Sequence, residues 1–219
     1  MEKGYFITGT DTNAGKTWAT IALMRYFKQQ GKSVAGMKPV ASGCFMQEGQ
    51  LKNADALLIQ ENASLQIDYD LINLYAYKLP VSPNIAGINN PVKLTKIVES
   101  FNVLKELAEI VVVEGAGGWY APLNDREDIS DLAEVLGLPV IMVVAIRLGC
   151  INHAKLTGQA IQHSGIPCVG WIAVCVDPDM LNRDENILTI KTALNVPLLG
   201  VLPYLDNADF DLLAGQLVL

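Results

Sequence analysis

The sequence predicts a doubly wound α/β fold, in which a mostly parallel β-sheet carries helices on both faces. Runs rich in Val and Ile alternate with helical segments, which is the pattern of parallel strands buried on both sides. Hydrophobic residues make up 51% of the chain and charged residues only 18%, as expected for a largely buried sheet. The first apolar run leads through a glycine-bounded loop into a helix. The chain has 219 residues, so we expect a single domain that spans residues 1–219.

The strands are expected where β-branched residues cluster and stop at polar or glycine-rich turns. These runs are residues 5–8, 32–37, 110–113, 140–144, 169–174 and 198–202. Because helical segments connect most of them, neighbouring strands are expected to run parallel. Six or seven parallel strands fit the chain.

The segments between the strands mix apolar and polar residues and are predicted helices. They are residues 18–30, 53–60, 92–107, 129–136, 152–163 and 185–194. Ser130 and Asn152 are plausible helix starts, since short polar side chains cap helix N-termini. Apart from its one predicted helix, the region 47–90 is harder to assign, because prolines such as Pro80 and Pro83 interrupt it.

Residues 9–17, Gly-Thr-Asp-Thr-Asn-Ala-Gly-Lys-Thr, join the first strand to the first helix. A loop in this context is typical of phosphate binding, because its N–H groups and the helix N-terminus attract phosphate oxygens. Lys16 would reach the outer phosphates, and the Thr17 hydroxyl would bind magnesium. Five residues, rather than the four of the strict motif, separate Gly9 from Gly15. An ordinary strand-to-helix turn is therefore the alternative.

Polar residues also follow the other strands, at the edge where ligands bind to such sheets. Lys38 and Ser42 follow the second strand, and Glu114 with a glycine-rich turn ends the third. Residues 147–152 lead from the fourth strand into a helix. Some of these residues have simpler explanations. Lys38 could be solvated, as most lysines are, and Glu114 could be a solvated carboxylate at a strand end. Asp55, near the start of the predicted helix 53–60, suits the first turn of any helix.

Composition argues against several classes of protein. The net charge of −7 opposes non-specific binding to nucleic acid or anionic membranes. No apolar run approaches a membrane span and residues 1–4 carry no signal segment, so we expect a cytoplasmic protein. The four cysteines lack metal-ligand spacing and are expected to be reduced and structural. Two histidines exclude a histidine-rich metal site, and His153 has no nucleophile placed to use it.

Seven stretches in order along nearly the whole chain carry a family resemblance. They are residues 5–12, 15–17, 38–43, 53–57, 113–119, 148–154 and 197–200, which include Thr-Gly-Thr-Asp-Thr, Lys-Pro-Val-Ala-Ser-Gly and Val-Glu-Gly-Ala-Gly-Gly-Trp. Together they resemble the dethiobiotin synthetases, the ATP-dependent cyclo-ligases of biotin synthesis, whose fold is of the P-loop NTPase type. The phosphate loop alone is a common motif, whereas the full set is highly specific.

The resemblance implies that 7,8-diaminononanoate, carbon dioxide and ATP give dethiobiotin, ADP and phosphate. One amine captures carbon dioxide as a carbamate, whose oxygen attacks the γ-phosphate to give a carbamic–phosphoric anhydride. The second amine then closes the cyclic urea and expels phosphate. Because two anions must meet, concentrated positive charge is needed, and Lys16, Lys38 and magnesium would supply it.

The resemblance also assigns roles to individual residues. The catalytic positions match Lys38, Lys16 and Thr12, and the magnesium ligands match Thr17, Asp55 and Glu114. The substrate positions match Ser42, Gly118, Cys150, Ile151 and Asn152. The last three begin a helix that binds the substrate carboxylate across the interface of a homodimer. The nucleotide positions match Asn13, Ala14, Gly15, Lys16, Thr17, Asp55, Glu114, Gly115, Ala116, Gly117, Val174, Cys175, Pro203, Tyr204 and Leu205.

The chain departs from the family pattern at two places in the site. Asn13 stands where the family often has Glu, which changes the charge of the loop and bears on the contact with the substrate amine but not on phosphate binding. Val174 and Cys175 replace the usual Asn-Asp pair, whose Asn reads the adenine edge. The chain also ends at Leu219, soon after residues 203–205, which flank the base. Because valine cannot hydrogen-bond a base, we expect poor discrimination between nucleotide bases.

Three other functions share this layout. Regulatory ATPase switches of the partitioning or septum-site type carry an additional lysine early in the loop, where residues 10–12 are Thr-Asp-Thr here, and their attraction to DNA or membrane fits poorly with the negative charge. A small-molecule kinase is a second alternative. A glutamine-dependent amide-forming synthase is a third, but the chain has no room for a glutaminase domain.

Overall fold

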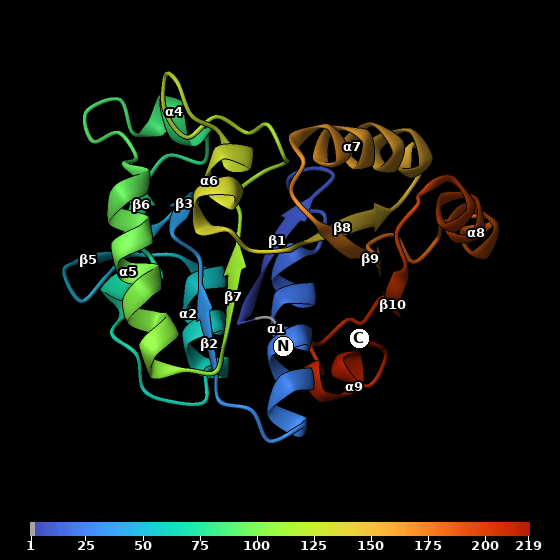
Figure 1. Cartoon of the computed structure of the whole chain (residues 1–219), viewed down its shortest axis with the longest axis horizontal. Helices are drawn as coiled ribbons and strands as arrows, with labels where there is room; N and C mark the ends of the chain where they lie inside the picture. Colours follow the sequence, from blue (N-terminus) through green and yellow to red (C-terminus); the bar gives the residue numbers. More distant parts are fainter. Residues whose placement is uncertain (1–2) are drawn as a thin grey trace.

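Six strands form the central sheet, in the order β10-β9-β8-β1-β7-β2, and every neighbouring pair is parallel (Figure 1). The computed structural model describes residues 3–219. The strands are β1 (Gly4–Gly9), β2 (Val34–Met37), β7 (Ile110–Glu114), β8 (Val140–Ile146), β9 (Cys168–Cys175) and β10 (Leu198–Leu202). The predicted fold class is therefore confirmed, and each of the six predicted strands lies in this sheet.

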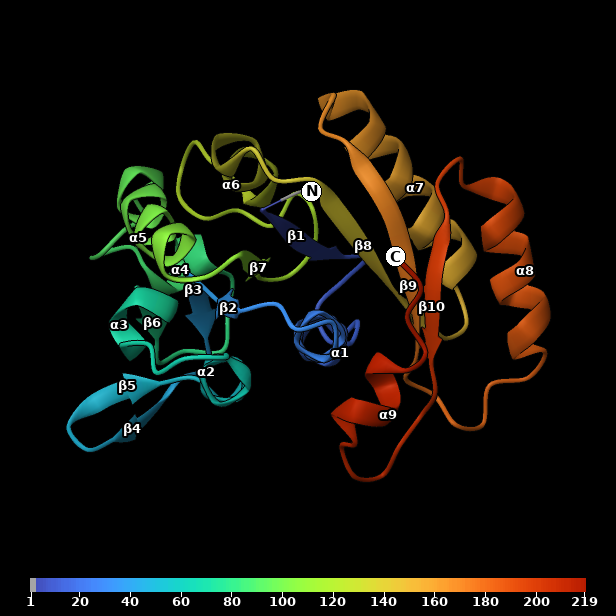
Figure 2. The ribbon, with the colours of Figure 1, turned by 60° about the horizontal axis from the view of Figure 1, so that its bottom comes forward.

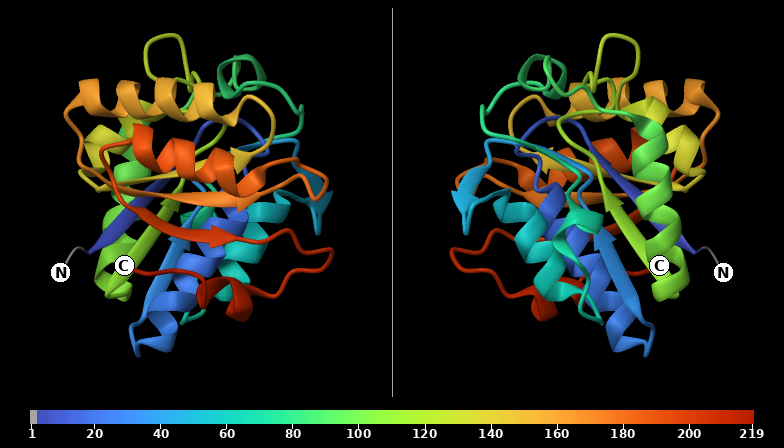
Figure 3. Two further views of the ribbon diagram at one scale, coloured as in Figure 1. Left: turned by 90° about the vertical axis from the view of Figure 1, so that its right-hand side faces the viewer. Right: turned by 90° about the vertical axis from the view of Figure 1, so that its left-hand side faces the viewer.

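Helices cover both faces of the sheet. One face carries α1 (Lys16–Gln29), α2 (Ala54–Asn62) and α9 (Phe210–Ala214), and the other carries α5 (Leu94–Leu107), α6 (Ile129–Leu136), α7 (Cys150–Ser164) and α8 (Arg183–Ala193) (Figure 2). In side view α7 and α8 lie on the opposite side of the strands from α1 and α9 (Figure 3). Burial of β2, β7 and β8 along their whole lengths follows from this double cover.

The segment between β2 and α5 contains several short elements. They are β3 (Val40–Ser42), β4 (Phe45–Gln47), β5 (Gln50–Lys52), α3 (Tyr69–Ile72), β6 (Tyr75–Tyr77) and α4 (Pro83–Ala86). β3 pairs with β6 in parallel, and β4 pairs with β5 as an antiparallel hairpin that projects from the body of the molecule (Figure 2). Most of these elements fall in the region that was hard to assign from the sequence.

The predicted range 129–136 matches α6, but neither Ser130 nor Asn152 caps its helix as expected. α6 begins at Ile129 after Asp128, whose carboxylate accepts the Ser130 N–H at 2.8 Å. Ser130 therefore lies inside the helix, and Asp128 is the residue that caps it. α7 begins at Cys150 after Gly149, whose φ of 92° is a conformation that glycine adopts readily. Asn152 is thus the third residue of α7.

Within residues 3–219, none of the helices is both long and apolar enough to cross a membrane. The carboxyl ends of β1, β2 and β7 meet at one edge of the sheet, because neighbouring strands in it are parallel. The loops that leave this edge carry the polar residues predicted from the sequence.

Candidate active site

A cavity of about 770 Å³ opens at the carboxyl ends of β1, β2 and β7. Its wall combines the phosphate loop, the start of α1, the ends of β2 and β7, and the segment 80–83. Twelve of the predicted site residues line it: Thr12, Asn13, Ala14, Gly15, Lys16, Thr17, Lys38, Ser42, Asp55, Glu114, Ala116 and Gly117. Residues that are far apart in the sequence are therefore brought together around one space.

The phosphate loop takes its shape from two residues with positive φ. Gly15 has a φ of 85° and Asn13 a φ of 57°, and asparagine is among the non-glycine residues that tolerate this region best. The Lys16 stem lies over Gly9, where an added Cβ would come within 3.0 Å of the lysine Cγ. The Lys16 ammonium donates to the Asp11 carbonyl at 2.9 Å. The loop therefore holds its lysine folded back along its own backbone.

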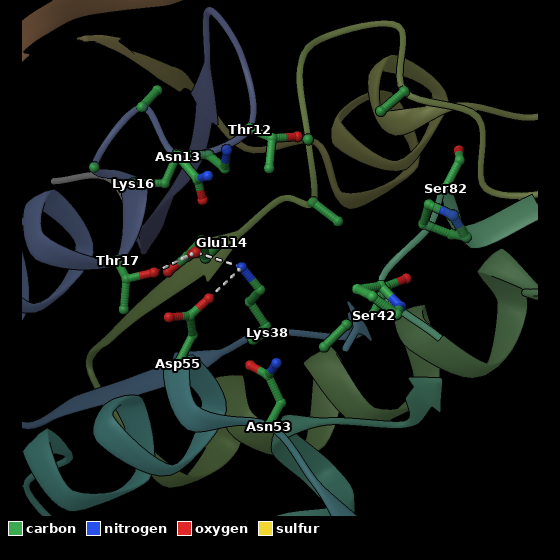
Figure 4. A pocket seen from close by; sticks show the side chains of 18 of the residues that line it. Thr12, Asn13, Lys16, Thr17, Lys38, Ser42, Asn53, Asp55, Ser82 and Glu114 are labelled. Atoms are coloured by element: carbon green, nitrogen blue, oxygen red, sulfur yellow. Dashed lines mark hydrogen bonds and ion pairs between the residues drawn. The ribbon is translucent and has the colours of Figure 1, made fainter. Parts of the chain in front are cut away.

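Lys38 lies between two carboxylates in the centre of the cavity wall (Figure 4). Its Nζ is 2.5 Å from Glu114 Oε1 and 3.3 Å from Asp55 Oδ2. The Thr17 hydroxyl donates to the same Glu114 oxygen at 2.9 Å. Glu114 is fully buried, Lys38 is almost fully buried, and Asp55 is partly exposed. The simpler explanations of Lys38 and Glu114 as solvated side chains are therefore excluded.

The two lysines respond differently to their surroundings. Burial of Lys16, reinforced by the nearby Lys38 charge, lowers the Lys16 pKa to about 8. Burial also opposes the charged form of Lys38, but the carboxylates of Glu114 and Asp55 outweigh this effect and raise the Lys38 pKa above its ordinary value. Lys38 is consequently a fixed ammonium at neutral pH, whereas Lys16 titrates close to it.

The predicted magnesium ligands lie around this cluster, and their chemistry fits the ion. Glu114 Oε2 is buried and has no hydrogen-bond partner among the described residues, and such an oxygen is normally satisfied. Residues 3–219 contain no group of three or more His, Cys, Asp or Glu side chains that could hold a metal. Magnesium in nucleotide sites commonly uses one or two carboxylates together with phosphate oxygens and water. Glu114, Asp55 and Thr17 match that donor set.

The cavity also contains residues that the sequence did not single out. Asn53 lines it, and its side chain accepts the Ala56 N–H at 3.2 Å to cap α2. This cap sets the first turn of α2, which carries Asp55. An asparagine just before a helical segment was the available signal. The segment 80–83 offered no such signal, because Pro-Val-Ser-Pro has no period that places it against the phosphate loop.

Ten predicted residues do not line this cavity: Gly115, Gly118, Cys150, Ile151, Asn152, Val174, Cys175, Pro203, Tyr204 and Leu205. Cys150 is buried, and Asn152 is exposed at the start of α7. Val174 is buried at the end of β9, where a Cβ added to Gly15 would meet its Cγ1 at 2.6 Å. Val174 therefore packs directly on the phosphate loop, and its apolar side chain leaves no room for a larger residue at position 15.

A parallel sheet whose first strand enters a Gly-Lys-Thr loop beside a strand-end carboxylate defines a P-loop nucleotide-binding protein. A family model described as an AAA domain matches residues 3–210. The fold resembles the septum site-determining protein MinD of Pyrococcus horikoshii, solved with Mg-ADP, with a TM-score of 0.56 and 17% identity over 93% of this chain and 82% of that one. The signal recognition particle receptor FtsY of Elizabethkingia anophelis matches with a TM-score of 0.59 and 16% identity, over 100% of this chain and 62% of that one. These likenesses concern the fold alone.

Sequence relatives are more specific. The ATP-dependent dethiobiotin synthetase BioD of Nitrosospira multiformis is 47% identical, over 95% of this chain and 92% of that protein. BioD 1 of Escherichia coli K12 is 44% identical, over 100% of this chain and 98% of that protein. The chain belongs to the dethiobiotin synthetase family, which confirms the resemblance and favours a ligase over the regulatory switch and the kinase.

Proposed function

We propose that this protein converts 7,8-diaminononanoate, carbon dioxide and ATP to dethiobiotin, ADP and phosphate. The observation that carries the proposal is the second lysine, Lys38, held in the wall of the cavity that the phosphate loop also lines. A phosphate loop alone suits any nucleotidase. A further ammonium beside the same space suits a reaction in which an anionic nucleophile must approach an anionic phosphate.

The reaction consists of three bond-forming steps. One amine of the diamine attacks carbon dioxide and loses a proton, which gives a carbamate. A carbamate oxygen attacks the γ-phosphorus and the bond to the β-phosphate oxygen breaks, so ADP leaves. The second amine attacks the carbamoyl carbon of the resulting anhydride, phosphate leaves with the bonding pair, and loss of a proton completes the cyclic urea.

The chain contributes charge and position more than covalent chemistry. Lys16 neutralises the outer phosphates, and the N–H groups of residues 13–17 surround them. Lys38 stabilises the carbamate and the phosphoryl oxygens as they approach each other. Thr12 and Ser42 contact the amine or the carbamate. The Ser42 hydroxyl is buried without a hydrogen-bond partner among residues 3–219 and lines the cavity, which supports this role.

Magnesium is the cofactor that Thr17, Asp55 and Glu114 would hold. When bound, it neutralises phosphate charge and polarises the γ-phosphoryl group. Lys38 contacts both of the carboxylates in this set, so its ammonium must share them with the ion or move into the cavity.

We also propose a homodimer, in which Cys150, Ile151 and Asn152 bind the carboxylate of the diamine held in the partner subunit's cavity. The start of α7 lies outside the chain's own cavity, as that arrangement requires. ATP is bound by the phosphate loop, and its base lies toward the residues at the ends of β9 and β10. We place the enzyme in the cytoplasm and assign it no nucleic-acid or membrane partner; its four free cysteines are compatible with a reducing compartment.

The test is phosphate release by the purified protein with Mg·ATP. We expect release to require both the diamine and bicarbonate, with one dethiobiotin formed per phosphate, as measured by mass spectrometry. Release that does not depend on bicarbonate, or a phosphorylated final product, would refute the ligase and favour a kinase. Lys16→Met is the matched control, because it removes the phosphate-binding ammonium while keeping most of the side-chain volume.

A further inference from the structure

Asp11 joins three contacts that tie the phosphate loop to the connection between β8 and α7. Arg147 Nη2 lies 2.7 Å from Asp11 Oδ2. The Thr12 N–H donates to Asp11 Oδ1 at 2.7 Å, and the Lys16 ammonium donates to the Asp11 carbonyl at 2.9 Å. Asp11 thus links Arg147, which is distant in sequence and follows β8, to the backbone and the lysine of the phosphate loop.

The sheet anchors only the beginning of this loop. β1 pairs with β8 as far as Gly9 and Val143, and the Thr10 N–H then donates to the Val143 carbonyl at 3.0 Å. In the described chain, the Arg147–Asp11 pair is the one hydrogen bond or ion pair that links residues 11–13 to a segment outside the loop. Without it, the part of the loop that carries Thr12 into the cavity would be held only by packing and by hydrogen bonds within the loop itself.

The pair is poorly suited to stabilising the fold. The Arg147 and Asp11 side chains are 39% and 48% exposed, and an exposed ion pair contributes little to stability. The pair also changes the charge of the loop, because an uncompensated Asp11 would place a negative charge on the loop that receives phosphates. Arg147 removes that repulsion without lining the cavity itself.

We infer that Arg147 is a positioning residue for the reaction. Acting through Asp11, it holds Thr12 and the Lys16 ammonium where the loop receives the nucleotide phosphates and the reacting carbamate. The carbamate part of this inference rests on the proposed function, whereas the phosphate part does not.

Arg147→Ala is the first test. We expect a fall in kcat on the order of 10- to 100-fold, because small misplacements of reacting groups have effects of this size, and a rise in the Kd for Mg·ATP of about threefold or more. The thermal melting temperature should stay near its wild-type value. Arg147→Lys, which keeps the charge, should recover most of the turnover.

Lys32→Ala is the matched control. Lys32 pairs with Glu109 at 2.9 Å with exposures of 33% and 51%, which closely resemble those of Arg147 and Asp11, but it lies at the opposite end of β2 from the cavity. We expect it to change neither kcat nor the Kd for Mg·ATP. An Arg147→Ala enzyme that matches this control in both quantities would overturn the inference.

A double-mutant cycle with Asp11→Asn separates action through Asp11 from an independent effect. If Arg147 works through Asp11, Arg147→Ala/Asp11→Asn should lose no more turnover than the more damaged single variant. Losses that multiply would overturn the inference. If the wild-type protein makes no dethiobiotin, the proposed function fails, but the same four proteins can be compared by their Kd for Mg·ATP. A double variant that binds Mg·ATP no more weakly than the weaker single variant supports the role of Arg147. Wild-type affinity in Arg147→Ala overturns it.

Discussion

Lys38 has a structural contact in the fold and a proposed role in catalysis. Its ammonium is the only positive charge within ion-pair distance of the buried Glu114 in the described chain. The same ammonium faces the cavity in which the carbamate is proposed to react. Removing it should therefore affect stability and turnover through separate causes, and these can be measured separately.

We predict that Lys38→Ala lowers turnover by about 100-fold or more while leaving Mg·ATP binding largely intact. Loss of positive charge at the reacting oxygens is the cause of the first effect. The variant should also lose about 3–5 kcal/mol of unfolding free energy, because Glu114 is left buried without its partner. Adding Glu114→Gln should restore part of the stability but none of the turnover. Wild-type turnover in Lys38→Ala would remove Lys38 from the mechanism.

The lowered pKa of Lys16 predicts a pH dependence of nucleotide binding. Phosphates favour the charged lysine, so affinity should be constant below the pKa of about 8 and weaken above it, by up to about tenfold per pH unit. Calorimetric titration with Mg·ATP between pH 6.5 and 9.5 would measure this. Lys16→Arg keeps its charge throughout this range, so its affinity for Mg·ATP should not weaken above pH 8 in this way. If the affinity of the wild-type protein and that of Lys16→Arg weakened equally with pH, the titrating group would not be Lys16.

Side chains were predictable where one local pattern identifies them. Lys16 and Thr17 follow from the loop motif, and Lys38 and Glu114 from their positions at the ends of apolar runs. Asp55 depended on the family resemblance, because an acidic residue in a first helical turn is common. The Arg147–Asp11 pair could not be predicted, because it depends on β8 lying next to β1, an order that the sequence does not encode locally.

At the scale of elements, α6 depends on its N-terminal cap. Asp128 accepts the Ser130 N–H, and Asp131 accepts the Asp128 N–H at 2.7 Å. We predict that Asp128→Ala lowers the unfolding free energy by about 1 kcal/mol, the usual effect of losing a cap. Asp128→Asn should be nearly neutral, because asparagine caps equally well. Urea denaturation of both variants measures the difference, and equal losses would mean that charge rather than capping matters.

The end of β9 leads to a prediction about the nucleotide base. Val174 packs on Gly15 and offers no hydrogen bond to a base. Turnover compared at equal concentrations of ATP, GTP and CTP should therefore differ by much less than a hundredfold. Val174→Asn, which restores a donor and an acceptor, should increase the preference for ATP. A hundredfold ATP preference in the wild-type enzyme would show that other groups read the base.

The long elements were predictable because each repeats a pattern over enough residues. All six sheet strands contain apolar runs, and the 14-residue α5 has a clear apolar face. The elements that could not be predicted, such as β3, α4 and α9, are three to five residues long. A segment of that length holds about one turn or one pleat, so no period can be detected.

At the scale of the whole molecule, apolar residues are exposed on the loops around the active site. Leu148, just before α7, is 95% exposed, and Ile85 and Ile88, in and beside α4, are also exposed. Exposed apolar side chains are common at interfaces between subunits. Leu148 directly precedes the start of α7, and in the proposed homodimer that start must reach the partner's cavity.

Subunit mixing tests this shared site directly. Lys38→Ala should inactivate a chain's own cavity, and Asn152→Asp should weaken carboxylate binding in the partner's cavity by placing a negative charge beside it. Each homodimer is then inactive. After random exchange between equal amounts, half of the dimers combine one chain of each kind, and each such dimer contains one site built only from unaltered residues. The mixture should therefore recover about a quarter of the wild-type turnover. If each site were built within one chain, mixing would recover nothing, and the homodimer would have no part in catalysis.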